Sequence, residues 1–464
     1  MLTMCEIAAI TGGNYSGADV QVGGFSIDTR SLSKDDLFVA IPGEVRDGHT
    51  FVDTALQTGA SGALVSKKGA QSEREIVVED TTTSLGEIAA SWRERFGIPV
   101  VGITGSNGKT TVTALVKTIL ERAGNVLSPV GSFNNQWGVP LTLLRMQSAH
   151  THAVIEMGMN HPGEIDRLTR IARPSVAVIN NAAAAHLEGL GTIENVARAK
   201  AEIITGVSAD GTIVLNADDP FYDYWVECAE SRRVVSFGSG DKADVTARSV
   251  RCGLTECRFE LVCAAESREV SLPLSGHHNV MNALAAASVA HALSIDLNVI
   301  VSGLEHASPV AGRLIPHRLQ NEVTIIDDTY NANPESMRAA IQVLSERSNK
   351  KVLVLGPMAE LGDDAAEAHR SVGEFARQSG IDVLLTFADS EHPFASGYQD
   401  GFGKGGQSFH SLESLIDCID SIASEQATVL CKGSRSSAME RVVEALLVRA
   451  GSGKTKTKAG ADQC

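Results

Sequence analysis

Short apolar runs alternate with amphipathic stretches along the first half of the chain. Apolar runs predict strands at residues 37–41, 62–66, 99–104, 153–157, 176–179, 212–215 and 234–237. Apolar positions at helical spacing predict helices at 85–96 and 110–123. Because strands and helices take turns, we expect α/β layers built on parallel sheets.

The pattern changes twice in the second half of the chain. Between about 240 and 275 polar and apolar residues alternate, as at 258–263, which predicts a small antiparallel β insertion before an alanine-rich helix at 279–293. We expect a hinge at 309–312, after which strands and helices alternate again. The strands are predicted at 324–327, 351–355, 383–387 and 428–431, and the helices at 336–345 and 438–450. The expected domains are therefore 1–82, 83–310 and 311–450. Residues 451–464 are rich in glycine and lysine and are expected to form a disordered tail.

Composition and charge narrow the class of protein. With 464 residues the chain is too long for one ordinary core, and 56 acidic against 40 basic residues give a net charge of −16, which argues against a nucleic-acid surface. No apolar run approaches the roughly 20 residues of a membrane helix, and the N-terminus lacks the regions of a signal peptide. We therefore expect a cytoplasmic protein without a membrane span. Cys252, Cys257 and Cys263 lie close together but do not have zinc spacing, so all eight cysteines are expected to be free thiols.

One glycine-rich segment has the context of a phosphate-binding loop. The sequence GITGSNGKTT at 102–111 lies between a predicted strand and a predicted helix, so backbone N–H groups and the helix N-terminus can face an anion. We expect Lys109 to neutralise the outer phosphates of ATP and Thr110 to offer its hydroxyl to Mg²⁺. Ile103 stands where the standard pattern has glycine, which marks a variant loop; the alternative is an ordinary strand–helix turn. A second match, GSGKT at 451–455, follows no predicted strand and is assigned to the tail. The expected nucleotide-binding residues of the loop are Gly105, Ser106, Asn107, Gly108, Lys109, Thr110 and Thr111.

Three further polar residues follow this loop in the chain. Glu156 lies at the end of one predicted strand, His186 comes soon after another, and Lys200 lies on a predicted helix. Carboxylates and imidazoles are common metal ligands, and a site for phosphates needs a metal nearby. Each residue is ambiguous alone, because a carboxylate at a strand end is more often a cap, a single histidine is more often structural and a helix lysine is more often a solvated charge.

A series of longer strings stands in order along the chain: TGSNGKTT, AVIEMG, NNAAAAHLEGLGT, ARAKAEI, GHHNVMNALAA, AGR and DDTYNANPESM. In order and rough spacing they resemble the Mur ligase family over nearly the whole chain. The strings SIDTR, GEVRDGH, FNNQWGVPLTLL, EMGMNHPGEI and KGSRSSAMERVV are similar to the members that add D-alanyl-D-alanine. One departure is Pro357 in GPMAELG, where those members commonly carry an acidic residue.

The resemblance implies a fold and a reaction. It implies a small α/β domain that binds a UDP-sugar, a central parallel-sheet domain that binds ATP, and a C-terminal Rossmann-like domain that binds the acceptor. The implied enzyme is an ATP-dependent ligase of peptidoglycan synthesis. It joins D-alanyl-D-alanine to UDP-N-acetylmuramoyl-tripeptide through an acyl phosphate, whether the tripeptide ends in meso-diaminopimelate or L-lysine. These two small molecules are the expected partners, and we expect a monomer.

The resemblance also implies roles for single residues, with Lys109, Glu156, His186 and Lys200 as the catalytic set. Thr110 and Glu156 would bind one Mg²⁺, His186 would bind a second, and Lys200, if carbamylated, would face that second ion as an anion. The implied nucleotide contacts beyond the loop are Asn282, Arg313 and Asp328. The implied substrate contacts are Asn134, Asn135, Tyr330, Asn331, Ser434 and Arg435, and, for the uridine diphosphate, Ser26, Asp28, Thr29, Arg30, Asp47 and His49.

Other interpretations stay open at this point. The residues of the first domain fit a hydrogen-bonded turn equally well, and Arg435 fits a local ion pair. Two other functions are a ligase of the same fold that adds a different amino acid or acts on folate, and a nucleotide-dependent switch that hydrolyses ATP slowly. The strings KGSRSSAME and NANPESM argue against the first of these.

Overall fold

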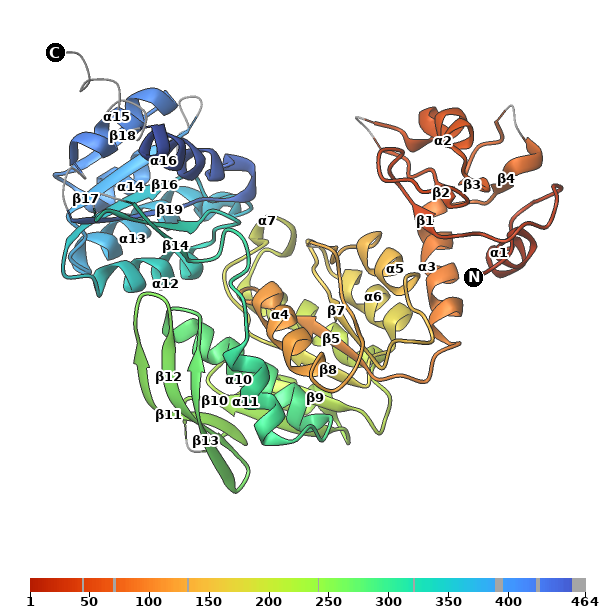
Figure 1. Cartoon of the computed structure of the whole chain (residues 1–464), viewed down its shortest axis with the longest axis horizontal. Helices are drawn as coiled ribbons and strands as arrows, with labels where there is room; N and C mark the ends of the chain where they lie inside the picture. The colour runs from red at the N-terminus through yellow and green to blue at the C-terminus, as the bar shows by residue number, and fades with distance from the viewer. Residues whose placement is uncertain are drawn as a thin grey trace, which may run out of the picture.

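The computed structural model describes residues 1–43, 46–69, 72–131, 133–240, 242–319, 322–388, 395–422 and 426–452. These residues form three sheets that follow one another along the chain, and Figure 1 shows them as three bodies. Each sheet lies within one of the three segments expected as domains. Below, these bodies are called the first, middle and C-terminal units. Within the described residues, none of the helices has the length and apolar character needed to cross a membrane.

The first unit is a small parallel sheet with helices on its faces. Its strands run in the order β1 (Phe25–Ser26), β2 (Leu37–Val39), β3 (Gly62–Val65) and β4 (Glu75–Val77). The helices are α1 (Met4–Thr11), η1 (Gly48–Phe51), α2 (Val52–Thr58) and η2 (Ser72–Arg74). Helix α3 (Thr81–Arg93) begins earlier than predicted because the Asp80 side chain caps it. Its apolar face joins the core of the first unit to that of the middle unit.

The middle unit contains a nine-stranded sheet in the order β13-β12-β11-β10-β9-β8-β5-β7-β6. The strands are β5 (Val100–Thr104), β6 (Val126–Leu127), β7 (His152–Glu156), β8 (Val176–Ile179), β9 (Thr212–Asn216), β10 (Arg233–Gly238), β11 (Val245–Cys252), β12 (Cys257–Cys263) and β13 (Glu266–Leu272). β5 lies between β7 and β8, and all three are parallel. Their carboxyl ends therefore share one edge of the sheet, where ligands of α/β proteins bind. The predicted antiparallel strands are present, but they continue this sheet, because β11 pairs with β10.

Helices cover both faces of the middle sheet. One face packs on α4 (Lys109–Leu120), α10 (His277–Ala292) and α11 (Leu297–Glu305). The other packs on α3, α5 (Gly138–Leu143), α6 (Glu164–Ala172), α8 (Ile193–Ala201) and α9 (Tyr222–Ala229). Neighbouring residues of a buried strand face opposite cores, as Val154 and Ile155 do. The short helices α7 (Leu187–Leu190) and η3 (Glu202–Gly206) flank α8.

The C-terminal unit contains a six-stranded sheet in the order β14-β15-β19-β16-β17-β18. The strands are β14 (Ile315–Arg318), β15 (Thr324–Asp328), β16 (Lys350–Leu355), β17 (Val383–Phe387), β18 (Gly406–Phe409) and β19 (Ala427–Lys432), and only β14, at the edge, is antiparallel to its neighbour. The helices are α12 (Pro334–Ser345), η4 (Gly362–Asp364), α13 (Ala365–Gln378), α14 (Ala395–Phe402), α15 (Leu412–Ile422), η5 (Arg435–Ser437) and α16 (Glu440–Ser452). Helix α16 extends into the predicted tail, whose remaining residues 453–464 lie outside the described part of the chain.

The middle and C-terminal units are joined by a short connection between α11 and β14. The predicted hinge at 309–312 lies in this connection, where Gly312 has a φ of 68°. The Tyr330 amide donates to the Gly312 carbonyl at 3.1 Å, which ties the end of the connection to the C-terminal unit.

The expectation of free thiols is wrong for Cys252 and Cys257. They form a disulfide across the turn between β11 and β12, with their Cα atoms 4.0 Å apart. The two residues are direct partners in the antiparallel register, which brings their side chains within reach of each other. Leu254, in the same turn, packs against the core of the C-terminal unit.

Candidate active site

The phosphate loop connects β5 to α4 and depends on glycine. Gly108 has a φ of 81°, and a Cβ there would lie 2.2 Å from the Asn282 side-chain oxygen and 2.5 Å from the Asn180 side-chain nitrogen. Any larger residue would therefore both strain the backbone and push these amides away. The loop lies directly against two asparagines, Asn180 just after β8 and Asn282 on α10.

A segment that follows β8 holds the loop in place. The Ser106 amide donates to the Asn181 carbonyl at 3.0 Å, and the Asn107 amide donates to the Asn181 side chain at 2.8 Å. The Ala183 amide donates to the Ser106 hydroxyl at 2.9 Å. The loop is thus fixed by hydrogen bonds to the segment that follows a neighbouring strand.

The side chain of Lys109 folds back onto the phosphate loop. Its Nζ donates to the Gly105 carbonyl at 2.7 Å and to the Ser106 carbonyl at 3.3 Å. Burial lowers the pKa of Lys109, and the nearby carboxylate of Glu156 opposes that effect. The amine thus lies inside the glycine cradle, where its charge would meet the phosphates of a bound nucleotide.

A cavity of about 680 Å³, which we call the loop cavity, opens beside Lys109 between the middle and C-terminal units. It is lined by most of the predicted site: Ser106, Asn107, Gly108, Lys109, Thr110, Asn134, Asn135, Glu156, His186, Arg313, Tyr330, Asn331, Ser434 and Arg435. The structure therefore brings together residues that are far apart in the sequence. Arg435 also forms an ion pair of 3.1 Å with Glu440, which agrees with the local role left open for it.

Two hydrogen bonds join the C-terminal unit to the loop. Arg313 donates to the Thr110 hydroxyl at 3.1 Å, and the Asn333 side chain donates to that of Asn107 at 2.7 Å. The Nε atom of Arg313 is buried and has no hydrogen-bond partner, which leaves a donor beside the loop for an anion. The Arg313 guanidinium also lies over the Tyr330 ring at 4.4 Å.

A second cavity, of about 310 Å³, lies on the α10 side of the loop and is called the amide-lined cavity. Thr111, Asn282 and Asp328 line it, together with Asn180, Asn181, Asn216 and Asn279. Apolar side chains such as Leu115 and Leu274 complete the wall. An apolar slot with amide groups beside a phosphate loop suits a nucleotide base.

The oxygen ligands beside the loop fit Mg²⁺. Thr110 and Glu156 line the loop cavity, and Glu156 is only 1% exposed and accepts from Asn134 at 2.8 Å. Among the described residues, no group of three or more histidine, cysteine, aspartate or glutamate side chains could hold a metal by itself. Mg²⁺ commonly uses one or two protein ligands and completes its shell with water and substrate phosphates, so a sparse protein set is compatible with it.

Lys200 lies deep in the middle unit on α8 and is 2% exposed. It lines neither of the two cavities. Burial lowers its pKa well below the usual value and the charge of Lys109 lowers it further, while Asp219 acts in the opposite direction. The structure therefore places the Lys200 amine behind the cavity wall, where burial disfavours its charged form.

Sequence reasoning missed three polar residues of the C-terminal unit that lie in this region. Lys432 forms a 2.6 Å ion pair with Asp328, Asn333 contacts the loop, and Glu360 lies 2.6 Å from the imidazole of His186. Lys432 lies in KGSRSSAMERVV, Asn333 in DDTYNANPESM and Glu360 in GPMAELG. The polar character of these residues within strings that resemble the family is the signal from which they could have been predicted.

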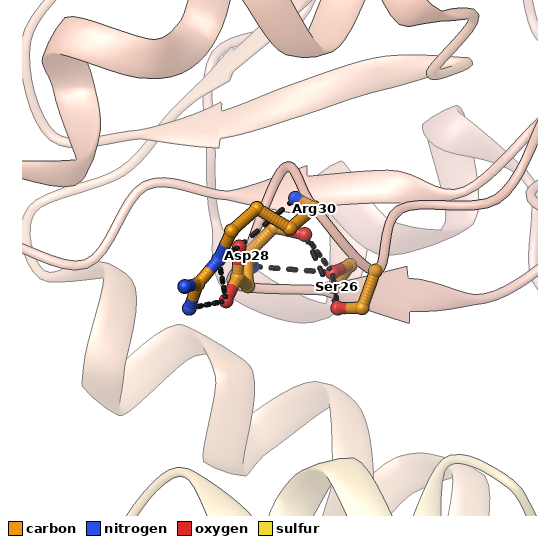
Figure 2. A network of polar contacts seen from close by, with 4 residues as sticks. Ser26, Asp28 and Arg30 are labelled. Carbon is orange, nitrogen blue, oxygen red and sulfur yellow. Dashed lines mark hydrogen bonds and ion pairs between the residues drawn. The ribbon is translucent and has the colours of Figure 1, made fainter.

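The six predicted residues of the first unit line neither cavity. Ser26, Asp28 and Arg30 bond to one another, as Figure 2 shows: the Asp28 amide donates to the Ser26 hydroxyl at 3.2 Å, and Arg30 Nε donates to Asp28 at 3.0 Å. Thr29 lies inside this turn. His49 Nδ1 lies 2.6 Å from Asp47 while its Nε2 accepts from the Ser66 amide at 2.9 Å. These hydrogen bonds are the ones expected of a structural turn, the alternative to a substrate site that the sequence left open for these residues.

Models of known protein families match three segments of the chain. They are the Mur ligase family catalytic domain at 21–93, the Mur ligase middle domain at 103–290, and the Mur ligase glutamate ligase domain at 312–435. The chain is 40% identical over 450 residues to UDP-N-acetylmuramoyl-tripeptide–D-alanyl-D-alanine ligase of Escherichia coli (strain K12), covering 96% of this chain and 98% of that protein.

Solved structures give a similar result. MurF from Acinetobacter baumannii superposes with a TM-score of 0.90 at 34% identity, covering 96% of this chain and 99% of that one. MurF ligase from Thermotoga maritima in complex with ADP superposes with a TM-score of 0.83 at 28% identity, covering 93% and 98%. The match extends over all three units.

Proposed function

This chain belongs to the Mur ligase family, and from that premise we propose that it joins D-alanyl-D-alanine to UDP-N-acetylmuramoyl-tripeptide at the expense of ATP. The product would be the UDP-linked pentapeptide used in peptidoglycan synthesis. The Escherichia coli relative, which carries the name of this reaction, supports the choice of substrates. The observation that carries the proposal is the loop cavity, in which the phosphate loop and polar side chains of the C-terminal unit line one space.

The chemistry needs two steps in that shared space. The terminal carboxylate of the tripeptide first takes the γ-phosphoryl group of ATP; the bond from the γ-phosphorus to the bridging oxygen breaks, and ADP leaves. The amine of D-alanyl-D-alanine then attacks the acyl carbon of the resulting acyl phosphate, inorganic phosphate leaves, and the nitrogen loses a proton. Lys109 and the loop amides would hold the phosphates, while Arg313 offers a cation to the negative charge that both steps concentrate.

The acceptor is proposed to bind at the C-terminal side of the loop cavity. Tyr330, Asn331, Ser434 and Arg435 line that side. A guanidinium can bind the carboxylate of the dipeptide through two parallel hydrogen bonds, although Arg435 would first have to leave Glu440. On the nucleotide side, Asn282 and Asp328 would contact ATP within the amide-lined cavity.

Bound Mg²⁺ would neutralise phosphate charge and polarise the transferred group. We propose Thr110 and Glu156 as ligands of one ion and His186 as a ligand of a second; all three line the loop cavity.

Lys200 is proposed to carry a carbamate. Formation of a carbamate requires a neutral amine, which reacts with CO₂ and releases a proton, and the lowered pKa of this buried lysine favours the neutral form. The resulting anion would supply negative charge to the second ion. We expect Lys200→Ala to be nearly inactive and to regain part of its turnover when short carboxylic acids are added. A fully active Lys200→Ala enzyme would remove the carbamate from the mechanism.

The remaining proposals concern the whole chain. We propose that the units spanning 1–82, 83–310 and 311–450 bind the UDP-sugar, ATP and the dipeptide, with Ser26, Asp28, Thr29, Arg30, Asp47 and His49 framing the uridine diphosphate and Asn134 and Asn135 contacting the substrate. We also propose that the chain acts as a monomer. Because the reaction consumes ATP, we place it in the cytoplasm.

A competition between acceptors tests the proposed function. The purified chain is given ATP, Mg²⁺ and a UDP-tripeptide that ends in meso-diaminopimelate or L-lysine, and incorporation of radiolabelled D-alanyl-D-alanine is compared with that of meso-diaminopimelate and L-lysine. We expect incorporation of the dipeptide alone. Equal or greater incorporation of a single amino acid would contradict the proposal, and ADP release at the full rate without either substrate would favour a nucleotide-dependent switch.

A further inference from the structure

One contact between the middle and C-terminal units joins two side chains at the wall of the loop cavity. Glu360 Oε2 lies 2.6 Å from Nδ1 of His186, in an ion-pair contact that lacks the angle of a hydrogen bond. The backbone repeats the contact, since the Glu188 amide donates to the Glu360 carbonyl at 3.3 Å. Both Glu360 and His186 line the loop cavity. In Figure 1, α7, which directly follows His186, lies beside the C-terminal unit.

Both residues are held in an uncommon backbone conformation. His186 has a φ of 58° and Glu360 a φ of 61°, in the left-handed region that costs a residue other than glycine about 1–2 kcal/mol. Such conformations persist only where the surroundings impose them, and they cluster at functional sites. Here two of them face each other from separate units across the cavity wall.

Hydrogen bonds within the C-terminal unit fix the backbone of the loop that carries Glu360 at three successive residues. The Met358 amide donates to Nε2 of the buried His369 at 3.0 Å, and the Tyr398 hydroxyl donates to the Gly356 carbonyl at 3.1 Å. The Ser434 amide donates to the carbonyl of Pro357 at 3.0 Å. Pro357 therefore takes part in this network through its carbonyl, and the loop reaches Glu360 in a defined position.

The position of the carboxylate bears on the tautomer of His186. A carboxylate oxygen 2.6 Å from Nδ1 favours the tautomer whose proton is on Nδ1, which leaves the lone pair of Nε2 for another partner. Carboxylates play this part for histidines that bind metals or phosphates.

We propose that Glu360 is a positioning residue of the shared active site, which orients the His186 imidazole and selects the tautomer that leaves Nε2 unprotonated. The proposal rests on the proposed function, because His186 acts there only if phosphates enter the loop cavity. Since Glu360 belongs to the C-terminal unit, His186 is oriented only while the two units are in contact.

The test compares three variants in the full-length chain. Glu360→Asn keeps a residue that tolerates the left-handed backbone but is too short to reach His186. Glu360→Gln keeps the length and one acceptor oxygen without the charge. The matched control is Glu188→Gln, which removes the same charge from an exposed neighbour and leaves its backbone hydrogen bond in place. ¹⁵N-histidine labelling reports the tautomer of His186 without nucleotide or metal, and a His186→Gln sample assigns its signal.

We expect His186 to carry its proton on Nδ1 in the native chain and in Glu188→Gln, and to lose this preference in Glu360→Asn, with Glu360→Gln between them. In the ligase assay, kcat of Glu360→Asn should fall about 10–100-fold while KM values change little, as for other partners of ligating histidines. An unchanged His186 signal in Glu360→Asn would overturn the proposal. So would a changed signal with native kcat, or a loss confined to KM, which indicates a contact that only joins the units. Because the spectra need no substrate, failure of the proposed ligase reaction would be seen separately.

Discussion

Replacement of Lys432 should destabilise the C-terminal unit, because the carboxylate of Asp328 would stay buried without its ion-pair partner. Lys432 is 4% exposed and Asp328 is 9% exposed, and their charged atoms lie 2.6 Å apart. Lys432 also donates to the Asn331 carbonyl at 2.9 Å. In Lys432→Met the methionine fills the space, but the Asp328 carboxylate stays buried without its ion-pair partner, and among the described residues only the charge of Arg313 and the Leu314 amide remain to stabilise it. Breaking a buried pair in this way costs about 3–5 kcal/mol.

Differential scanning calorimetry can measure this loss. For a unit of this size, a loss of that magnitude corresponds to a fall of about 10 °C in the transition of the C-terminal unit. Because burial already raises the pKa of Asp328 and Lys432 opposes that rise, the deficit should be largest at neutral pH. It should shrink as the pH is lowered and the carboxyl becomes neutral. The control Lys350→Met removes an exposed lysine from β16 and should change stability by less than about 0.5 kcal/mol.

The double variant Lys432→Met/Asp328→Asn separates the buried charge from lost packing. With both charges gone, much of the stability should return, because an uncharged amide costs less to bury than a carboxylate. If the double variant were as unstable as the sum of the two single variants, the two side chains would be uncoupled. The reasoning from their ion pair would then be wrong.

Three other predictions concern the phosphate loop and the amide-lined cavity. Gly108→Ala should weaken ADP binding at least about tenfold by calorimetry, because its Cβ would meet an amide oxygen at 2.2 Å; Gly163→Ala has a similar φ of 85° with nothing within 4 Å and should leave binding unchanged. Lys109→Ala should lower kcat by at least about 100-fold with a native circular dichroism spectrum, and retained activity would contradict the role of the loop. Partial burial in the wall of the amide-lined cavity, followed by the charge of Lys432, lowers the pKa of His278 from 6.5 to about 4, so the unfolded chain binds a proton at a higher pH than the folded chain does. Stability should be full above pH 6.5 and fall by up to about 3 kcal/mol toward pH 4; urea titrations should show that His278→Gln removes this part of the slope and that its exposed neighbour variant His277→Gln does not.

Most strands and helices could be predicted from the sequence because their apolar patterns are local. The strands at 176–179 and 383–387 have the predicted bounds. Helix bounds moved where a side chain caps the first turn, as Asp80 does for α3 and Asn333 for α12. A cap consists of one or two local hydrogen bonds and leaves no periodic signal. The order of strands in the middle sheet depends on packing between distant segments, so the antiparallel strands were predicted as an insertion although they extend that sheet.

The site shows the same division between local and distant determinants. The phosphate loop is a local strand–loop–helix element, and its residues could be predicted from spacing alone. Glu156 and His186 were predicted because one ends a strand and the other comes soon after another, and the carboxyl ends of parallel strands meet at one edge; their roles stay a prediction. Glu360 contacts His186 only because the middle and C-terminal units meet at the loop cavity. No sequence pattern near Glu360 predicts that contact. The disulfide between Cys252 and Cys257 likewise depends on the register of β11 with β12.

The short connection between α11 and β14 has a kinetic consequence. This connection is the covalent link between the two units that form the loop cavity. The middle unit contributes the phosphate loop, and the C-terminal unit contributes Arg313 and Glu360. The connection therefore acts as a tether that sets the local concentration of one half-site around the other, on the order of millimolar for a short flexible link. A chain cut within 306–312 would keep every side chain of the loop cavity and lose only that concentration. Its turnover would become second order in protein, and the two pieces would have to be mixed near that concentration to match the intact chain.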